Sequence, residues 1–104
     1  MRRGEVWWAD LEPPAERRPV LLVSRDEVYR VHEWATVAPV STRTRGIRAE
    51  VELNPKDGLP HHCAVNLESL ITVRKSRLQK RITQLSSSKI QAVNEAIKFA
   101  LELP

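Results

Sequence analysis

Short apolar runs, rather than helical spacing, dominate the first 85 residues of the chain. Residues 5–11 are rich in aromatic and branched side chains, residues 19–24 form a continuous apolar run, and residues 48–53 alternate polar and apolar. A continuous run is typical of a strand buried on both faces, and alternation is typical of a half-buried strand. The pattern therefore predicts strands at these places, with three more at 35–41, 64–67 and 70–73.

Breaking residues predict the connections between these strands. Consecutive prolines predict a loop over residues 11–16, and two prolines with Gly58 predict another over residues 54–60. Residues 25–33 are polar and poorly periodic, which indicates an irregular connection, and residues 76–80 predict a single helical turn. Proline cannot donate to a strand ladder, so Pro39 predicts an edge strand or a bulge.

The last segment has helical periodicity instead. Ser86 or Ser87 can cap a helix there, because a serine hydroxyl accepts from the first free N–H groups. One face of that helix carries apolar residues at the spacing of an amphipathic helix, namely Ile90, Val93, Ile97, Ala100 and Leu101. The predicted fold is mainly β with helices: a small, mostly antiparallel β-barrel or curled sheet with a long C-terminal helix. The length of 104 residues fits one domain, residues 1–104.

The net charge and the cysteine content limit which classes of protein the chain fits. The formal net charge is +4, and its positive excess lies in the middle of the chain, which favours an anionic partner without identifying it. The basic clusters are Arg43, Arg45 and Arg48, then Arg74, Lys75, Arg77, Lys80 and Arg81. The single cysteine excludes an internal disulfide, and no apolar run has the length of a leader or a membrane span. We therefore expect a cytoplasmic protein with no membrane partner.

Two arrangements of histidines are weighed and disfavoured. His61, His62 and Cys63 are adjacent, but neighbouring residues of an extended chain point to opposite faces, and no second pair of ligands follows nearby. A polar loop leading into a strand is the favoured interpretation, and no metal site is expected. His32 with His61 or His62 would suit acid–base cleavage of RNA, but nothing in the sequence brings them together.

A pair of arginines stands immediately before the buried run of residues 19–24. Pro19 belongs at the start of a strand, so Arg18 lies where a loop meets a sheet, a position from which a guanidinium can meet a phosphate. At the end of a neighbouring strand, five residues offer three hydroxyls and two guanidiniums: Ser41, Thr42, Arg43, Thr44 and Arg45. From these residues alone a solvated basic loop is slightly favoured over a phosphate site.

Taken together, several segments resemble the MazF/PemK/Kid family of toxin endoribonucleases. They occur in family order over nearly the whole chain: Arg3-Gly4-Glu5-Val6-Trp7, Arg18-Pro19-Val20-Leu21, Val37-Ala38-Pro39-Val40-Ser41, Leu70-Ile71-Thr72-Val73 with Arg77-Leu78, and Leu85-Ser86. The resemblance implies an SH3-like barrel, a homodimer and an acidic MazE-like antitoxin. It also implies sequence-specific, ribosome-independent and metal-independent cleavage of single-stranded RNA, with no cofactor, to 2′,3′-cyclic phosphate and 5′-hydroxyl ends.

The same resemblance assigns roles to residues. The family's catalytic arginine falls on Arg18 and its catalytic threonine on Ser41, with Thr42 beside it as a second hydroxyl. The expected RNA contacts are Glu16, Arg17, Thr42, Arg43, Thr44, Arg45, Asn66, Ser69 and Arg74. The loop before Arg18 is shorter than in many members, and Ser69 stands where many carry glutamine. We expect both departures to alter the RNA sequence that is read.

Two alternatives from other classes remain open at this point. A CcdB-like toxin would bind DNA gyrase and cleave no RNA, and a non-catalytic RNA-binding module would bind RNA with a steep salt dependence and leave it intact. The pairing of Arg18 with Ser41 separates them, because a pure binding module has no need of it.

Overall fold

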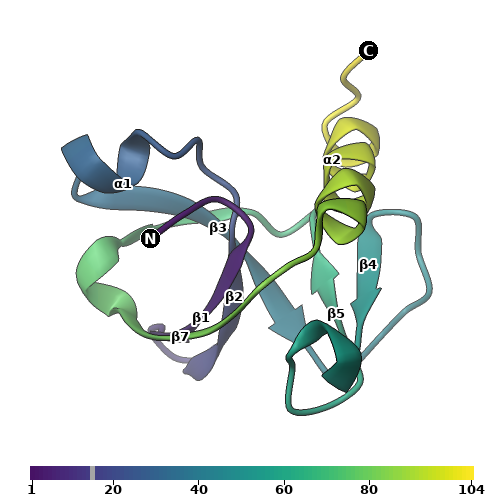
Figure 1. Ribbon diagram of the computed structural model, residues 1–104, viewed down its shortest axis with the longest axis horizontal. Helices are drawn as coiled ribbons and strands as arrows, with labels where there is room; N and C mark the ends of the chain where they lie inside the picture. Colours follow the sequence, from purple (N-terminus) through teal and green to yellow (C-terminus); the bar gives the residue numbers. More distant parts are fainter. Residues whose placement is uncertain (15) are drawn as a thin grey trace.

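The computed structural model describes residues 1–14 and 16–104; Ala15, part of the loop predicted over residues 11–16, lies outside the described residues. Within these described residues, seven antiparallel strands form a sheet in the order β4-β5-β3-β2-β1-β7, with β6 pairing with β3 off this path. The strands are β1 (Glu5–Asp10), β2 (Arg17–Leu22), β3 (Trp34–Ser41), β4 (Glu50–Leu53), β5 (Cys63–Asn66), β6 (Ile71–Arg74) and β7 (Leu78–Gln84). The predicted class, mainly β with a C-terminal helix, is confirmed (Figure 1).

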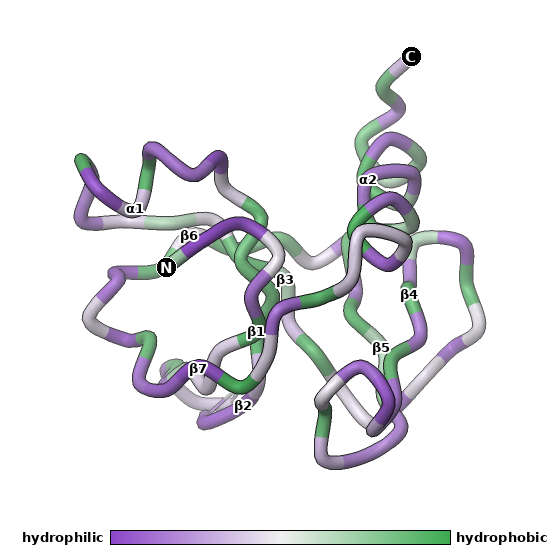
Figure 2. The backbone as a smooth tube through the Cα atoms, viewed as in Figure 1, coloured by the Kyte–Doolittle hydropathy of each residue, from purple (hydrophilic) through white to green (hydrophobic). Residues whose placement is uncertain are grey.

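The long helix α2 (Ser87–Ala100) is capped as predicted. The Ser86 hydroxyl accepts from the backbone N–H of Lys89 at 3.3 Å. α2 lies beside β4 and β5, and its N-terminal end faces the sheet while the chain end projects away (Figure 1). Green apolar segments alternate with purple polar ones along this helix, which is the pattern of an amphipathic helix (Figure 2). Val93 and Ala96 are its buried residues, and Leu101, predicted for the apolar face, is 52% exposed.

β3 lies at the centre of the sheet, so the prediction of an edge strand at Pro39 is wrong. One side of β3 pairs with β2, and the other pairs first with β6 and then with β5. The β6 pairing ends at Val37 and the β5 pairing begins at Val40. Pro39 therefore lies where β3 changes partner, a break in the ladder at which a residue without an N–H is tolerated.

Two groups of buried side chains hold the fold together. One packs between the sheet and α2 and includes Leu21 and Val93; the other includes Val20 and Leu22 and packs against α1 (Val28–Val31). Successive residues of β2 therefore enter different cores, which confirms the prediction of a strand buried on both faces. Because β2 packs against a core on each face, the backbone of its first residues is held in place, and so are the starting points of their side chains.

Two connections differ from the prediction. Residues 25–33 contain α1, which is anchored by the buried Tyr29, whose hydroxyl donates to the carbonyl of Ser24 at 3.1 Å. Residues 76–80 were predicted as a helical turn, but the turn is the 3₁₀ segment η2 (Lys75–Arg77) and β7 follows it. A second 3₁₀ segment, η1 (Pro55–Asp57), lies within the loop of residues 54–60.

The sequence pattern does not predict β7, because β7 is a polar strand at the edge of the sheet. It pairs with β1 through two register shifts, and most of its first residues are exposed. An ion pair joins the two strands: Arg81 Nε donates to Glu5 Oε2 at 2.9 Å. Burial raises the pKa of the Glu5 carboxyl, but hydrogen bonds from Trp7, the Arg2 N–H and Arg81 outweigh it and lower that pKa below its ordinary value.

No helix among the described residues is long and apolar enough to cross a membrane.

Candidate functional site

The sheet register brings Arg18 and Ser41 together. In the β2–β3 pair, Val20 lies opposite Pro39. The same register carried two residues further places Arg18, near the start of β2, opposite Ser41, the last residue of β3. Residues two apart on a strand share a face, so both side chains leave the sheet on the side of Val20 and Pro39.

A small cavity of about 130 Å³ opens beside Ser41. Its walls come from β1, from β2, from the end of β3 and from the segment that leads into β5. The lining residues are Trp8, Pro19, Val40, Ser41, Thr42, Leu59, Pro60, His61 and Cys63. The walls are mainly apolar, with two hydroxyls and one imidazole, which suits a flat, partly polar ligand group.

The Ser41 hydroxyl is oriented by its own loop. Its oxygen accepts from the Arg43 backbone N–H at 3.1 Å, which leaves the hydroxyl hydrogen to donate outwards. The loop is tied back to β4, because Glu50 Oε1 accepts from the backbone N–H groups of Arg45 and Gly46 at 2.9 and 3.1 Å. Residues 42–45 are exposed, and of these four only Thr42 lines the cavity.

Arg17 and Glu16 come shortly before Pro19, the β2 residue of the cavity wall, and neither of them lines the cavity. The Arg17 guanidinium carbon is 4.5 Å from the centre of the Trp8 ring, and its Nε donates to Gln79 Oε1 at 3.4 Å. Glu16 has a φ of 51° and closes the preceding loop through its backbone, its carbonyl accepting from the Leu11 N–H at 3.0 Å. The Glu16 side chain is exposed.

Arg74 lies far from this site, at the opposite end of β3. It is paired with Trp34, seven residues before Ser41, and at ~3.3 Å per residue this separates the two ends by about 23 Å. The Arg74 guanidinium carbon is 4.7 Å from the centre of the Trp34 ring, and its Nη1 is 3.4 Å from Glu33 Oε2. Within one copy of the chain, Arg74 therefore cannot contact the same phosphate as Arg18.

Asn66 and Ser69 do not line the cavity; they lie at and after the end of β5, the strand that pairs with the end of β3. Asn66 lies two residues beyond Ala64, the partner of Ser41 in β5, and its Oδ1 accepts from the Glu68 N–H at 2.9 Å. The Ser69 N–H donates to the Asn66 carbonyl at 3.4 Å, so both residues shape one turn after β5.

Trp8 and His61 line the cavity, although neither was predicted as a site residue. Trp8 is half-buried. His61 was considered only as a metal ligand or as a partner of His32, which ends α1 near the far end of β3. Within residues 1–14 and 16–104 no three His, Cys, Asp or Glu side chains are grouped to hold a metal ion. Residues 60–62 form a bend before β5, so strand alternation gave no sequence signal for His61.

Comparison with known proteins gives a consistent result. Residues 2–101 match the family model described as the PemK-like, MazF-like toxin of type II toxin–antitoxin systems. The chain is 38% identical to the probable endoribonuclease MazF5 of Mycobacterium tuberculosis over 101 residues, which cover 96% of this chain and 92% of that one. It is 31% identical to the endoribonuclease EndoA of Bacillus subtilis over 111 residues, covering 99% and 96%.

Two solved structures have the same fold. The Mycobacterium tuberculosis toxin MazF-mt6 superposes with a TM-score of 0.89 at 31% identity, covering 96% of this chain and 98% of that one. An endoribonuclease from a mycobacterial species, solved in complex with its cognate antitoxin, superposes with a TM-score of 0.90 at 27% identity, covering 100% and 97%. The chain therefore belongs to the family of PemK-like, MazF-like toxins of type II toxin–antitoxin systems.

Proposed function

We propose that this MazF-like toxin is an endoribonuclease that cuts single-stranded RNA beside the cavity at the end of β3, with Arg18 and Ser41 as its catalytic residues. The observation that supports the proposal is the β2–β3 register, which sets Arg18 and Ser41 at the same end of the two strands, next to a cavity that Ser41 lines. The related proteins named endoribonucleases support the reaction class.

The chemistry needs an attack within the RNA itself. The ribose 2′ oxygen bonds to the adjacent phosphorus, and the bond from phosphorus to the 5′ oxygen breaks, which leaves a 2′,3′-cyclic phosphate and a 5′-hydroxyl end. Negative charge builds on the phosphate oxygens in the transition state. The Arg18 guanidinium stabilises that charge, and the Ser41 hydroxyl positions the phosphate by donating its hydrogen bond. A guanidinium does not release its proton near neutral pH, so the role of Arg18 is electrostatic.

The surroundings of the cavity suit an unpaired RNA strand. Single-stranded RNA is recognised through bases that leave the stack and lie against aromatic or apolar surfaces, which Trp8 and the other cavity walls provide. Arg17 and the loop of residues 42–45 supply positive charge and hydroxyls for the neighbouring phosphates. The substrates are messenger RNA and other cellular RNAs that present the recognition sequence in a single strand.

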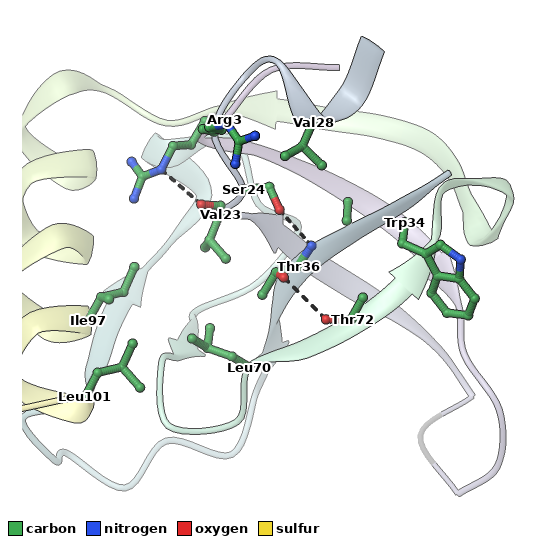
Figure 3. A pocket seen from close by; sticks show the side chains of 12 residues that line it. Arg3, Val23, Ser24, Val28, Trp34, Thr36, Leu70, Thr72, Ile97 and Leu101 are labelled. Atoms are coloured by element: carbon green, nitrogen blue, oxygen red, sulfur yellow. Dashed lines mark hydrogen bonds between the residues drawn. The ribbon is translucent and has the colours of Figure 1, made fainter. Parts of the chain in front are cut away.

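An exposed apolar hollow supports the homodimer. It has a volume of about 480 Å³ and lies between the end of α2 and the strands β3 and β6; Figure 3 shows Ile97, Leu101 and Leu70 gathered at one end and Trp34 at the other. Trp34 is 46% exposed and Leu101 is 52% exposed, so a sizeable apolar surface is in contact with water. A second copy of the chain would bury it. In a dimer the Arg74 of one copy could also approach the RNA held by the other.

The partner of the toxin is an acidic antitoxin. The net charge of +4 and the exposed basic loop favour an acidic chain, which would compete with RNA for the same groups. One related endoribonuclease was solved with its cognate antitoxin. Residues 1–104 act as one toxin domain in the cytoplasm, where the RNA substrates are. The gyrase-binding alternative has no observation in its favour.

The function is tested by incubating the protein with a long RNA in EDTA and mapping the 5′ ends of the fragments. We expect cuts at one short sequence, with 5′-hydroxyl ends and cyclic phosphates. Intact RNA would contradict the proposal, and cuts at random positions would contradict its sequence specificity.

A further inference from the structure

His61 faces the cavity that Ser41 lines, whereas its neighbour His62 faces away from it. The imidazole of His61 is part of the cavity lining. His62 Nε2 instead lies 3.9 Å from Glu52 Oε2 on β4. Residues 60–62 form a bend before β5, and both His61 and Cys63 line the cavity. Of these two adjacent histidines, His61 lines the cavity and His62 does not.

The other lining groups are unsuited to carry a proton near neutral pH. The hydroxyls of Ser41 and Thr42 do not ionise there. Burial raises the pKa of the Cys63 thiol, and the charge of Asp57 raises it further, so this thiol stays protonated. Among the described residues that line the cavity, His61 is the side chain with a ring nitrogen that can accept a proton as a neutral base.

Cleavage of RNA by its own 2′ hydroxyl needs such a group, because the 2′ oxygen is a weak nucleophile until it loses its proton. We infer that His61 is the general base of this site, an inference that rests on the function proposed above. The neutral imidazole accepts the proton of the 2′ hydroxyl as the 2′ oxygen bonds to phosphorus. The bond from phosphorus to the 5′ oxygen breaks, the 5′ oxygen takes a proton from water, and the exposed imidazolium returns its proton to solvent.

The charged and titratable groups around His61 come from several elements. Arg17 stacks on Trp8, which forms one wall of the cavity, and Cys63 on β5 forms another. Arg18 follows Arg17 in β2 and is not among the lining residues. Asp57 of η1 acts on the same thiol, and the pair of His62 and Glu52 lies on the far side. In this mechanism Arg18 stabilises the developing negative charge, Ser41 positions the phosphate, and His61 accepts the proton of the 2′ hydroxyl.

The test compares single-turnover cleavage of a short RNA that contains the mapped site. We expect His61→Ala and His61→Gln to cleave about 10²–10⁴-fold more slowly, the range for removal of a general base. Binding of the same RNA with a 2′-deoxy sugar at the cleavage site should be unchanged. The matched control, His62→Ala, should cleave as fast as the wild type. The fall in rate towards acidic pH should disappear in His61→Ala, and added imidazole should restore part of its rate.

Three results would overturn the role of His61. They are a wild-type rate in His61→Ala, recovery of the rate in His61→Gln, which keeps hydrogen bonding but cannot act as a base, and a loss that merely follows weaker RNA binding. A wild-type protein that cleaves no RNA would instead refute the proposed function, so the two failures are distinguishable.

Discussion

The guanidinium of Arg17 stacks on the ring of Trp8, with its carbon 4.5 Å from the ring centre. Trp8 in turn forms a wall of the cavity that contains Ser41. The flat face of the guanidinium packs against the ring, so its N–H groups at the edge remain able to donate to a phosphate. The two neighbouring arginines therefore differ: Arg17 is held against an aromatic wall, and Arg18 lies opposite Ser41.

Replacing Arg17 with alanine should weaken RNA binding without removing cleavage. Loss of one phosphate contact should lower the slope of log binding constant against log salt by about 0.7, the value for a single-stranded nucleic acid. Fluorescence anisotropy with a labelled, uncleavable RNA at several salt concentrations measures this slope. A slope equal to that of the wild type would show that Arg17 contacts no phosphate.

Ser41→Ala should slow cleavage more than Thr42→Ala. The Ser41 hydroxyl is fixed by the Arg43 N–H and is half-buried, whereas Thr42 is exposed. Removal of one positioned donor costs about 10²–10³ in rate, and Ser41→Thr should retain activity because it keeps the hydroxyl. Single-turnover rates of the three variants settle which hydroxyl acts. A larger loss in Thr42→Ala would move the role to Thr42.

Much of this architecture could be predicted from the sequence, and the misses have physical causes. The run Pro19–Ser24 and the capped helix were clear because burial and capping leave a local pattern. β7 was missed because its exposed residues carry charge and its partner, β1, is remote in the chain. Arg18 and Ser41 were predicted together, but Trp8 and His61 were not, since only the folded sheet brings the segments before β5 and within β1 to one cavity.

Glu5→Gln should lower stability near pH 7 and have little effect in acid. The pKa of Glu5 is lowered in the folded state, so its stabilisation is present above the pKa of the unfolded chain and is lost as pH falls through the folded value. We expect a loss of about 1.5–3 kcal/mol in the free energy of unfolding at pH 7, the range for hydrogen bonds to charged groups. Urea unfolding at pH 7 and near pH 3 measures it. Glu68→Gln, at an exposed position, is the control, and an equal loss at both pH values would refute the assignment.

Trp34→Glu should convert the dimer to a monomer. The substitution puts a charge into the apolar hollow that also contains Leu101 and Ile97, where a second copy would have to desolvate it. Sedimentation velocity over a range of concentrations reports the change. Leu103→Glu, at a residue that is also 52% exposed but lines a different hollow, should remain dimeric. Dissociation by the control alone would place the interface elsewhere.

The central claim is that Arg18 stabilises the transition state of RNA cleavage, and the single-turnover rate of Arg18→Ala tests it most directly. The measurement uses an RNA with the mapped site, saturating protein and EDTA, with Arg17→Ala as the matched control. We predict a loss of about 10²–10³ in the cleavage rate for Arg18→Ala, the cost of removing one charge-stabilising donor, with unchanged cleavage position. A cleavage rate equal to that of the wild type would contradict the account and remove Arg18 from the mechanism.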